Sequence, residues 1–212
     1  GGRVQEAGYA AGRHRRSGLS PRRRAGHVVV VDRGFVAAGP TGRSTGVVRQ
    51  HYTVPTLAQM ARDSVRVFED FASRVGGEAG FCRCGYVILS GFGNAALLAK
   101  TVEMHGRLGI RVSLLSADEL KAFEPRLNVS DVACGALEPD GGYADPALAA
   151  HSFCEAARVD GAEVLTSTKV LALRVRRGRI VGVATDQGPI ATRMVVNAAG
   201  PWAGAIAFSA GL

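Results

Sequence analysis

The sequence has no long run of apolar residues. Of its 212 residues, 47% are apolar and 21% are charged, and no apolar stretch approaches the roughly 18 residues that a membrane-spanning helix needs. Arginines occur near the N-terminus but no apolar core follows them, so we expect neither a secretory signal nor a membrane partner. The composition excludes a membrane class and a disordered chain, and it predicts a globular protein of one or two domains.

Cysteine is scarce as well. The four cysteines, Cys82, Cys84, Cys134 and Cys154, are scattered along the chain, and a Cys-x-Cys pair lacks the usual spacing of metal ligands. We interpret them as reduced thiols of a cytoplasmic protein, and we expect no metal site.

Acidic residues are nearly absent from the first 26 positions, which contain seven arginines and a single acidic residue, Glu6. The net charge of the chain is +8, but this basic segment carries +6 of it, which leaves only +2 for residues 27–212. An arginine-rich arm could contact nucleic-acid phosphates. Because the rest of the chain is nearly neutral, we interpret the arm as a solvated tail and expect no nucleic-acid partner.

Two apolar runs that lie far apart in the sequence organise the chain. Val28–Val31 is β-branched and ends at Asp32, and an acid at this place in a dinucleotide-binding unit hydrogen-bonds the ribose hydroxyls. The run 195–202 predicts a buried strand that turns at once into a helix at Pro201. The small residues 198–200 would let a flat ligand approach the backbone. Together the two runs predict one adenine-dinucleotide site, whereas either alone fits an ordinary strand junction.

A glycine-rich loop at residues 39–46 follows the first run. Its glycines, its hydroxyl side chains and Arg43 offer donors suited to a phosphate or a flavin edge. An ordinary surface loop has the same composition. Val47 and Val48 then begin a buried segment, which places Arg49 and Tyr52 near this loop.

Periodicity and turn signals predict the remaining elements. We expect helices at 55–75, 94–108, 117–123 and 146–159 and from 203, and strands at 84–90, 110–115, 132–138, 163–166, 170–176, 179–185 and 190–197. The strands and short helices after residue 78 predict a separate α+β lobe.

Five stretches carry a resemblance to a known family, in the family's order. They are Val28–Arg33, Thr41–Tyr52, Glu138–Pro146, Thr168–Val170 and Val195–Trp202. Together they resemble the FAD-dependent amine and amino-acid oxidoreductases, a family that includes D-amino-acid oxidase, glycine oxidase and sarcosine oxidase. The sarcosine oxidase β-subunit type is the most similar.

This resemblance implies an α/β fold, namely a three-layer, Rossmann-like FAD-binding domain with an inserted α+β substrate lobe. Residues 27–77 and 146–212 would form the FAD-binding domain and residues 78–145 part of the substrate lobe, after a basic, non-matching segment at 1–26. Family members are nearly twice as long, so we expect the chain to correspond to their N-terminal half.

The resemblance also implies FAD as the cofactor and assigns residues to it by position. The implied FAD-binding residues are Asp32, Arg33, Thr41, Ser44, Thr45, Gly46, Val47, Val170, Ala198, Ala199 and Gly200. The first two match the ribose site, and the group from Thr41 to Val47 matches the loop along the pyrophosphate and flavin ring. Val170 matches a residue whose backbone contacts adenine, and the last three match a strand end beside the dinucleotide.

Arg49 and Tyr52 are the implied catalytic residues. Arg49 matches an arginine that grips the substrate carboxylate in sarcosine oxidases, and the planar guanidinium suits a bidentate contact. A surface or ion-paired arginine is the alternative. Tyr52 matches an active-site tyrosine, and we expect His51 to be structural rather than a catalyst or a covalent flavin anchor.

The implied activity is oxidation of the carbon–nitrogen bond of a secondary or tertiary amine, such as an N-methyl amino acid. The flavin accepts the hydride, and oxygen or a carrier protein then accepts the electrons. The alternative is an inactive, truncated or frame-disrupted remnant, because residues 1–26 lack the family's Gly-x-Gly-x-x-Gly turn. We hypothesise that this segment is read in a wrong frame or from a misplaced start. Translation of the upstream DNA in all three frames would test this hypothesis.

Overall fold

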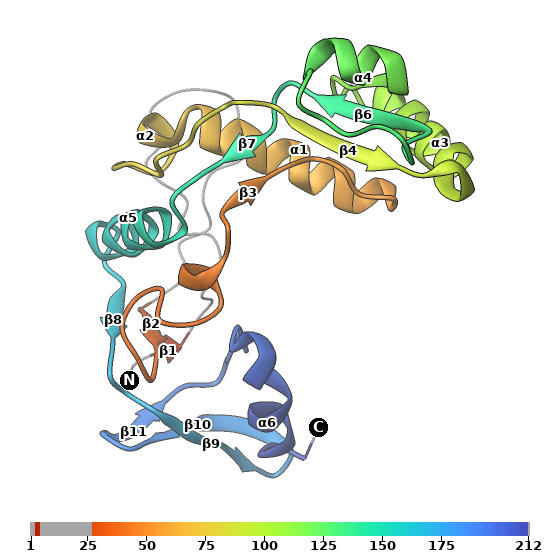
Figure 1. Cartoon of the computed structure of the whole chain (residues 1–212). Coiled ribbons are helices and arrows are strands. Elements are labelled where there is room, and N and C mark those ends of the chain that lie inside the picture. The colour runs from red at the N-terminus through yellow and green to blue at the C-terminus, as the bar shows by residue number, and fades with distance from the viewer. Residues whose placement is uncertain (1–2, 5–26, 212) are drawn as a thin grey trace. The chain divides into compact units, whose positions relative to one another are not determined.

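The computed structural model describes residues 3–4 and 27–211 (Figure 1). The chain divides into two compact units. Unit 1 comprises residues 1–44, 71–79 and 146–212, and unit 2 comprises residues 45–70 and 80–145. The hypotheses about a shifted reading frame and a solvated tail concern residues that, apart from 3–4, lie outside the described part.

A parallel sheet forms one half of unit 1. Its strand order is β1 (Arg3–Val4), β2 (Val28–Val31) and β8 (Glu163–Leu165), with Val29 opposite Glu163. The predicted strand at 28–31 is confirmed. The sequence predicts no strand at residues 3–4, yet β1 pairs there with the edge of β2. Two residues show no periodicity, so only the tertiary pairing reveals such a strand.

The helix α5 (Pro146–Val159) leads into β8. Pro146 stands at the start of the helix, where its missing N–H costs nothing. The helix ends before Gly161, whose φ of +92° is a left-handed conformation that suits glycine. The predicted bounds of 146–159 are confirmed.

An antiparallel sheet forms the other half of unit 1, in the order β11 (Gly188–Ala191), β10 (Arg179–Thr185) and β9 (Val170–Arg176) (Figure 1). Arg177 and Gly178 join β9 to β10 with φ values of 51° and 70°, the two positive values that a type I′ hairpin requires. Val29 and Val183 are buried at the centre of a hydrophobic cluster, in which residues of both sheets pack together.

The final predicted strand, 190–197, is wrong beyond Ala191. Thr192 diverts the chain, because its Oγ1 accepts a hydrogen bond from the Met194 N–H at 3.2 Å and donates one to the Met194 carbonyl at 2.9 Å. Val195 is only partly buried against the cluster. A short 3₁₀ turn, η3 (Gly200–Trp202), then leads into α6 (Ala203–Phe208), so the helix predicted from 203 is confirmed.

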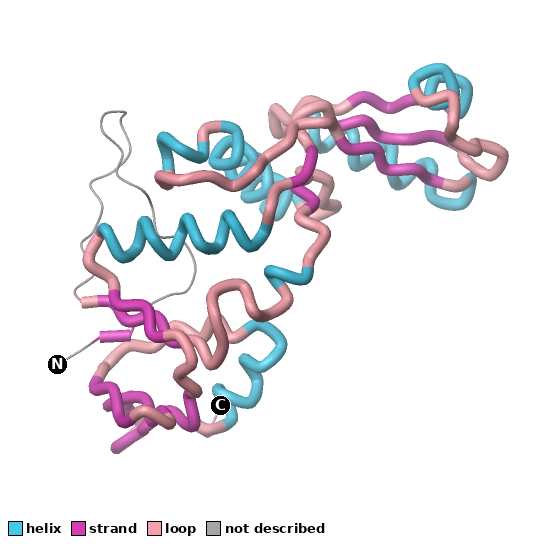
Figure 2. Tube along the Cα trace, turned by 60° about the vertical axis from the view of Figure 1, so that its left-hand side comes forward, coloured by secondary structure: helices cyan, strands magenta, loops and turns pink. Residues whose placement is uncertain are grey.

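Unit 2 contains an antiparallel sheet with helices (Figure 2). The strand order is β4 (Tyr86–Ser90), β6 (Cys134–Glu138) and β5 (Ser113–Ser116), and the helices α3 (Ala95–Arg107) and α4 (Ala117–Phe123) pack on it. Ser116 and Glu119 form a capping box at the start of α4, where the sequence predicts a helix from residue 117. Leu120 of α4 is fully buried.

The helix predicted at 55–75 is interrupted. The helix α1 (Pro55–Glu69) ends at Asp70, whose φ of −127° and ψ of 44° are not helical, and α2 (Phe71–Arg74) belongs to unit 1. Helical spacing predicts one apolar stripe along the whole segment, but Leu57 and Met60 are 45% and 62% exposed. The stripe is therefore not one continuous buried face.

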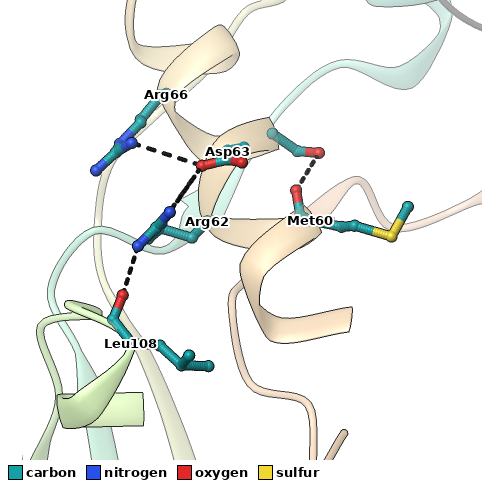
Figure 3. A network of polar contacts seen from close by, with 6 residues as sticks. Met60, Arg62, Asp63, Arg66 and Leu108 are labelled. Atoms are coloured by element: carbon teal, nitrogen blue, oxygen red, sulfur yellow. Dashed lines mark hydrogen bonds and ion pairs between the residues drawn. The ribbon is translucent and has the colours of Figure 1, made fainter. Parts of the chain in front are cut away.

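Polar contacts connect α1 to the end of α3 within unit 2 (Figure 3). Arg62 donates from Nη1 to the carbonyl of Leu108 and from Nε to Asp63 Oδ1, the latter at 3.3 Å. Arg66 lies 3.5 Å from the same Asp63 oxygen. Unit 2 also contains the short antiparallel pair β3 (Val47–Val48) and β7 (Gly142–Tyr143).

These contacts explain why the units differ from the predicted domain boundaries. Residues 45–70 fall in unit 2 because β3 pairs with β7 and α1 packs against α3, whereas residues 78–79 fall in unit 1. No helix in the described ranges is long and apolar enough to cross a membrane.

Candidate functional site

Asp32 lies at the carboxyl end of β2, where a parallel sheet places its ligands. Its Oδ1 accepts a hydrogen bond from the Gly34 N–H at 2.7 Å. Within the part of the chain that the structure describes, its second carboxylate oxygen accepts no hydrogen bond, and the residue is exposed. The carboxylate can therefore accept a hydrogen bond from a hydroxyl group of a ligand.

The backbone of Asp32 brings two of the predicted stretches together. The Thr168 N–H donates to the Asp32 carbonyl at 2.9 Å, which holds residues 168–170 beside the end of β2. Val170 begins β9 and packs against the hydrophobic cluster. Its side chain therefore has a structural role, and only its backbone remains for the predicted adenine contact.

Arg33 and Trp202 bring the third stretch to the same part of unit 1. The Arg33 guanidinium carbon lies 4.2 Å from the centre of the Trp202 ring, within the range of a cation–π contact. Trp202 ends η3, and its N–H donates to the carbonyl of Ala199 at 3.1 Å. Gly200, with a φ of +55°, takes the left-handed conformation that this turn needs.

The loop after β2 folds back on itself. A Cβ added to Gly42 would lie 2.2 Å from the Ala37 carbonyl oxygen, so the two backbone segments touch at a point where only glycine fits. Thr41 begins the 3₁₀ turn η1 (Thr41–Arg43), and the Ser44 N–H donates to the Thr41 carbonyl at 3.1 Å. Both hydroxyl residues are exposed.

Unit 2 holds the other predicted residues. Thr45 and Val47 are exposed, and Gly46 has a φ of +66° while its carbonyl accepts a hydrogen bond from the Ala144 N–H at 2.9 Å. This contact and the pairing of Val47 with Tyr143 fix the backbone just before Arg49.

The Arg49 guanidinium lies near two tyrosine rings. Its Nη1 donates to the Tyr86 hydroxyl at 3.1 Å, and its guanidinium carbon lies 5.9 Å from the Tyr52 ring centre and 5.6 Å from that of Tyr86. Among the described residues no carboxylate pairs with it, and Arg49 is exposed. The ion-paired alternative is therefore not seen, and the remaining guanidinium N–H groups can bind an external carboxylate.

A buried cluster in unit 2 was not predicted. His51, His105 and Glu138 place one ligand atom each within 4.8 Å of one another. They come from the segment after β3, from α3 and from the end of β6, so no sequence spacing indicates the cluster. The expected structural role of His51 stays a prediction.

An ion pair lies just after the cluster in the chain. Asp140 accepts two hydrogen bonds from Arg111, one of them from Nε at 2.8 Å, and its Oδ1 lies 3.6 Å from Arg83 Nη1. The hydrogen bond from Arg111 is the largest cause that lowers the pKa of the Asp140 carboxyl below its ordinary value. This pair holds the turn between β6 and β7, which in turn supports β3.

The chain matches a protein-family model over most of its length. The model described as "FAD dependent oxidoreductase" matches residues 17–211 of the chain. The match thus covers most of unit 1 and all of unit 2.

Individual curated relatives match most of this chain. Mitochondrial sarcosine dehydrogenase of Mus musculus is 27% identical over 194 residues, which cover 88% of this chain and 21% of that protein. The mitochondrial pyruvate dehydrogenase phosphatase regulatory subunit of Mus musculus is 26% identical over 177 residues, 83% of this chain and 20% of that protein. The chain thus spans about a fifth of the length of these curated relatives.

Among solved structures, the L-proline dehydrogenase from P. horikoshii is similar with a TM-score of 0.80 and 28% sequence identity. The likeness covers 88% of this chain and 50% of that one.

Proposed function

Because this chain belongs to the family of FAD-dependent oxidoreductases, we propose that it serves the oxidation of the carbon–nitrogen bond of a secondary or tertiary amine, such as an N-methyl amino acid. The family match and the solved relatives confirm the predicted resemblance, the α/β fold and FAD as the cofactor of the family. The substrate and the activity of this protein are our proposal.

The single observation that carries the substrate proposal is Arg49. It is an exposed guanidinium held between Tyr52 and Tyr86, and no carboxylate of the described part pairs with it. A planar guanidinium with unused N–H groups binds a carboxylate in a bidentate way. A substrate with a carboxylate beside its amine, as in sarcosine, matches this group.

The predicted residues of unit 1 offer hydrogen-bond donors and acceptors of the kinds that an adenine dinucleotide needs. Asp32 would hold the ribose hydroxyls through its unpaired oxygen, with Arg33 beside it. Thr41 and Ser44 would donate hydrogen bonds to the pyrophosphate. The Val170 backbone would contact adenine, and residues Ala198–Gly200, which lie just before and within the start of η3, would lie against the dinucleotide.

In unit 2, the exposed Thr45 and Val47 and the half-buried Gly46 would lie along the flavin ring. When bound, the flavin supplies the hydride acceptor, because the redox chemistry belongs to the cofactor. The protein residues bind and orient the substrate. Arg49 binds the substrate carboxylate, and Tyr52 and Tyr86 hold the guanidinium in place. We further propose a small-molecule amine as the substrate and oxygen or a carrier protein as the final electron acceptor. We also propose a cytoplasmic location, which cell fractionation would test.

Titration of the purified protein with FAD, followed by quenching of flavin fluorescence, tests the cofactor assignment. We expect saturable binding, weakened about tenfold by Asp32→Ala because a hydrogen bond to a charged group is lost. Glu155→Ala, which removes an exposed carboxylate from α5 of the same unit, is the matched control and should bind like the wild type. A folded protein that binds no FAD would support the inactive remnant instead.

Steady-state oxidation of sarcosine with a dye as electron acceptor tests the role of Arg49. We expect Arg49→Lys to raise KM roughly 10- to 100-fold with a smaller effect on kcat, because the bidentate contact is lost while the charge stays. Arg66→Lys, on the surface of α1, is the control. Dimethylamine lacks the carboxylate, so its oxidation should not depend on Arg49. Equal effects on both substrates would contradict the assignment.

A further inference from the structure

We propose that His51, His105 and Glu138 bind a divalent metal ion of the zinc class inside unit 2. Glu138 Oε1 lies 3.3 Å from His51 Nδ1 and 3.7 Å from His105 Nδ1. The two imidazole rings meet edge to face, with centroids 4.8 Å apart. The proposal is independent of the proposed oxidoreductase function, and it differs from the sequence-based expectation of no metal site.

The hydrogen bond of His105 determines which of its nitrogens is available. His105 Nε2 lies 2.9 Å from the carbonyl oxygen of Tyr52. A carbonyl oxygen only accepts, so Nε2 carries the hydrogen. In the neutral ring Nδ1 then has a lone pair, and this lone pair faces the Glu138 carboxylate. Two electron-rich atoms face each other here, which a cation between them would stabilise.

The cluster is buried and its facing atoms are unpaired. His105 and Glu138 are fully buried and the His51 side chain is 11% exposed. Within the described residues, His51 Nδ1, His105 Nδ1 and Glu138 Oε1 are buried without a hydrogen-bond partner. Each buried unpaired polar group costs about 1–3 kcal/mol. Three such atoms that converge on one point therefore indicate a bound polar species.

The spacing and the donor set suit zinc. Ligand atoms at roughly 2.0–2.2 Å from a tetrahedral zinc ion lie about 3.4 Å from one another. The distances of 3.3 Å and 3.7 Å to Glu138 Oε1 are close to that value. Two neutral imidazoles and one carboxylate form a known zinc donor set, which leaves a fourth position for water.

The surrounding hydrogen bonds orient the ligands. The Gln50 N–H donates to Glu138 Oε2 at 2.9 Å, which turns the other oxygen, Oε1, toward the two rings. Partners of this kind fix ligand orientation in metal sites. Because Gln50 and Tyr52 both bond to ligands of the site, the metal would fix the backbone that carries Arg49 and Tyr52.

The test uses the purified full chain after dialysis against a chelator. Zn²⁺ is added and the bound metal is counted by elemental analysis, and Co²⁺ serves as the spectroscopic probe. We expect one metal ion per chain, visible absorption bands typical of four-coordinate Co²⁺, and loss of those bands when Zn²⁺ displaces it. His105→Gln and Glu138→Gln should weaken binding by more than the roughly 10- to 100-fold seen for outer-shell partners.

Two controls separate this site from adventitious binding. His151→Gln removes an exposed histidine of α5, and the double variant Cys82→Ser/Cys84→Ser removes two exposed thiols. Both should keep full binding. If the variants at buried positions fail to fold, the metal binding of His51→Gln tests the proposal, because the His51 ring is partly exposed. Absence of stoichiometric binding, or binding that follows the thiols and survives His51→Gln, would overturn the proposal.

Discussion

The guanidinium of Arg33 lies over the indole ring of Trp202, 4.2 Å from its centre. Arg33 follows β2 and Trp202 ends η3, so the contact joins the two runs that the sequence predicts at a dinucleotide site. Both residues belong to unit 1 and both are exposed. Trp202 is the only tryptophan of the chain, so tryptophan fluorescence reports on this residue alone.

We expect Arg33→Ala to increase the quenching of Trp202 fluorescence by acrylamide, because the guanidinium no longer covers one ring face. The free energy of unfolding should fall by only about 0.5–1 kcal/mol, the usual size of an exposed cation–π contact. Arg43→Ala, in the same loop, is the control and should leave the quenching unchanged. Identical quenching in Arg33→Ala and the wild type would show that the contact is not formed in solution.

The ion pair between Asp140 and Arg111 predicts a pH dependence. The pKa of Asp140 is lowered in the folded protein, chiefly by the hydrogen bond from Arg111. Its stabilisation is therefore fully present above the unfolded pKa of about 3.9 and is lost as the pH falls through the lower, folded pKa. We expect Asp140→Asn to lower the free energy of unfolding at pH 7 by about 1 kcal/mol, with a difference that shrinks below about pH 4.

Urea unfolding followed by circular dichroism at pH 7, 5 and 3 measures this effect. Asp131→Asn, at an exposed position of the same unit, is the matched control and should show no such trend. A difference between Asp140→Asn and the wild type that stays constant over the whole pH range would refute the assignment to the carboxylate charge.

Gly142 should not tolerate a side chain. A Cβ at this position would lie 2.0 Å from the carbonyl oxygen of Cys82, and that oxygen accepts a hydrogen bond from the Tyr143 N–H at 3.1 Å. Backbone atoms cannot move aside as a flexible side chain can. We expect Gly142→Ala to cost about 3 kcal/mol or more of unfolding free energy, since it forces β7 away from its partners.

Gly93→Ala is the matched glycine control, because nothing lies within 4 Å of an added Cβ there. Its effect on urea unfolding should stay within about 0.5 kcal/mol. Similar losses for both variants would mean that the close approach of Gly142 to Cys82 does not limit stability.

Local signals allowed much of the fold to be predicted. The turn at Arg177 and Gly178, which both take positive φ values, lies between two β-branched runs and predicts the bounds of β9 and β10. The capping box of Ser116 and Glu119 likewise predicts the start of α4. Such features depend on neighbours within a few residues, so the sequence alone contains the information. The family resemblance follows from short motifs of the same kind.

Tertiary structure decided the features that depend on distant partners. The pairing of β1 with β2, the break of the 55–75 helix at Asp70 and the turn at Thr192 that ends β11 leave no periodic signal. The candidate site shows the same division. Asp32 and Arg49 were predicted by position, whereas His105 and Glu138 meet His51 only because α3 and β6 pack against the segment after β3. The burial of these side chains and the convergence of their lone pairs are properties of the packed unit. No spacing in the sequence could therefore predict them.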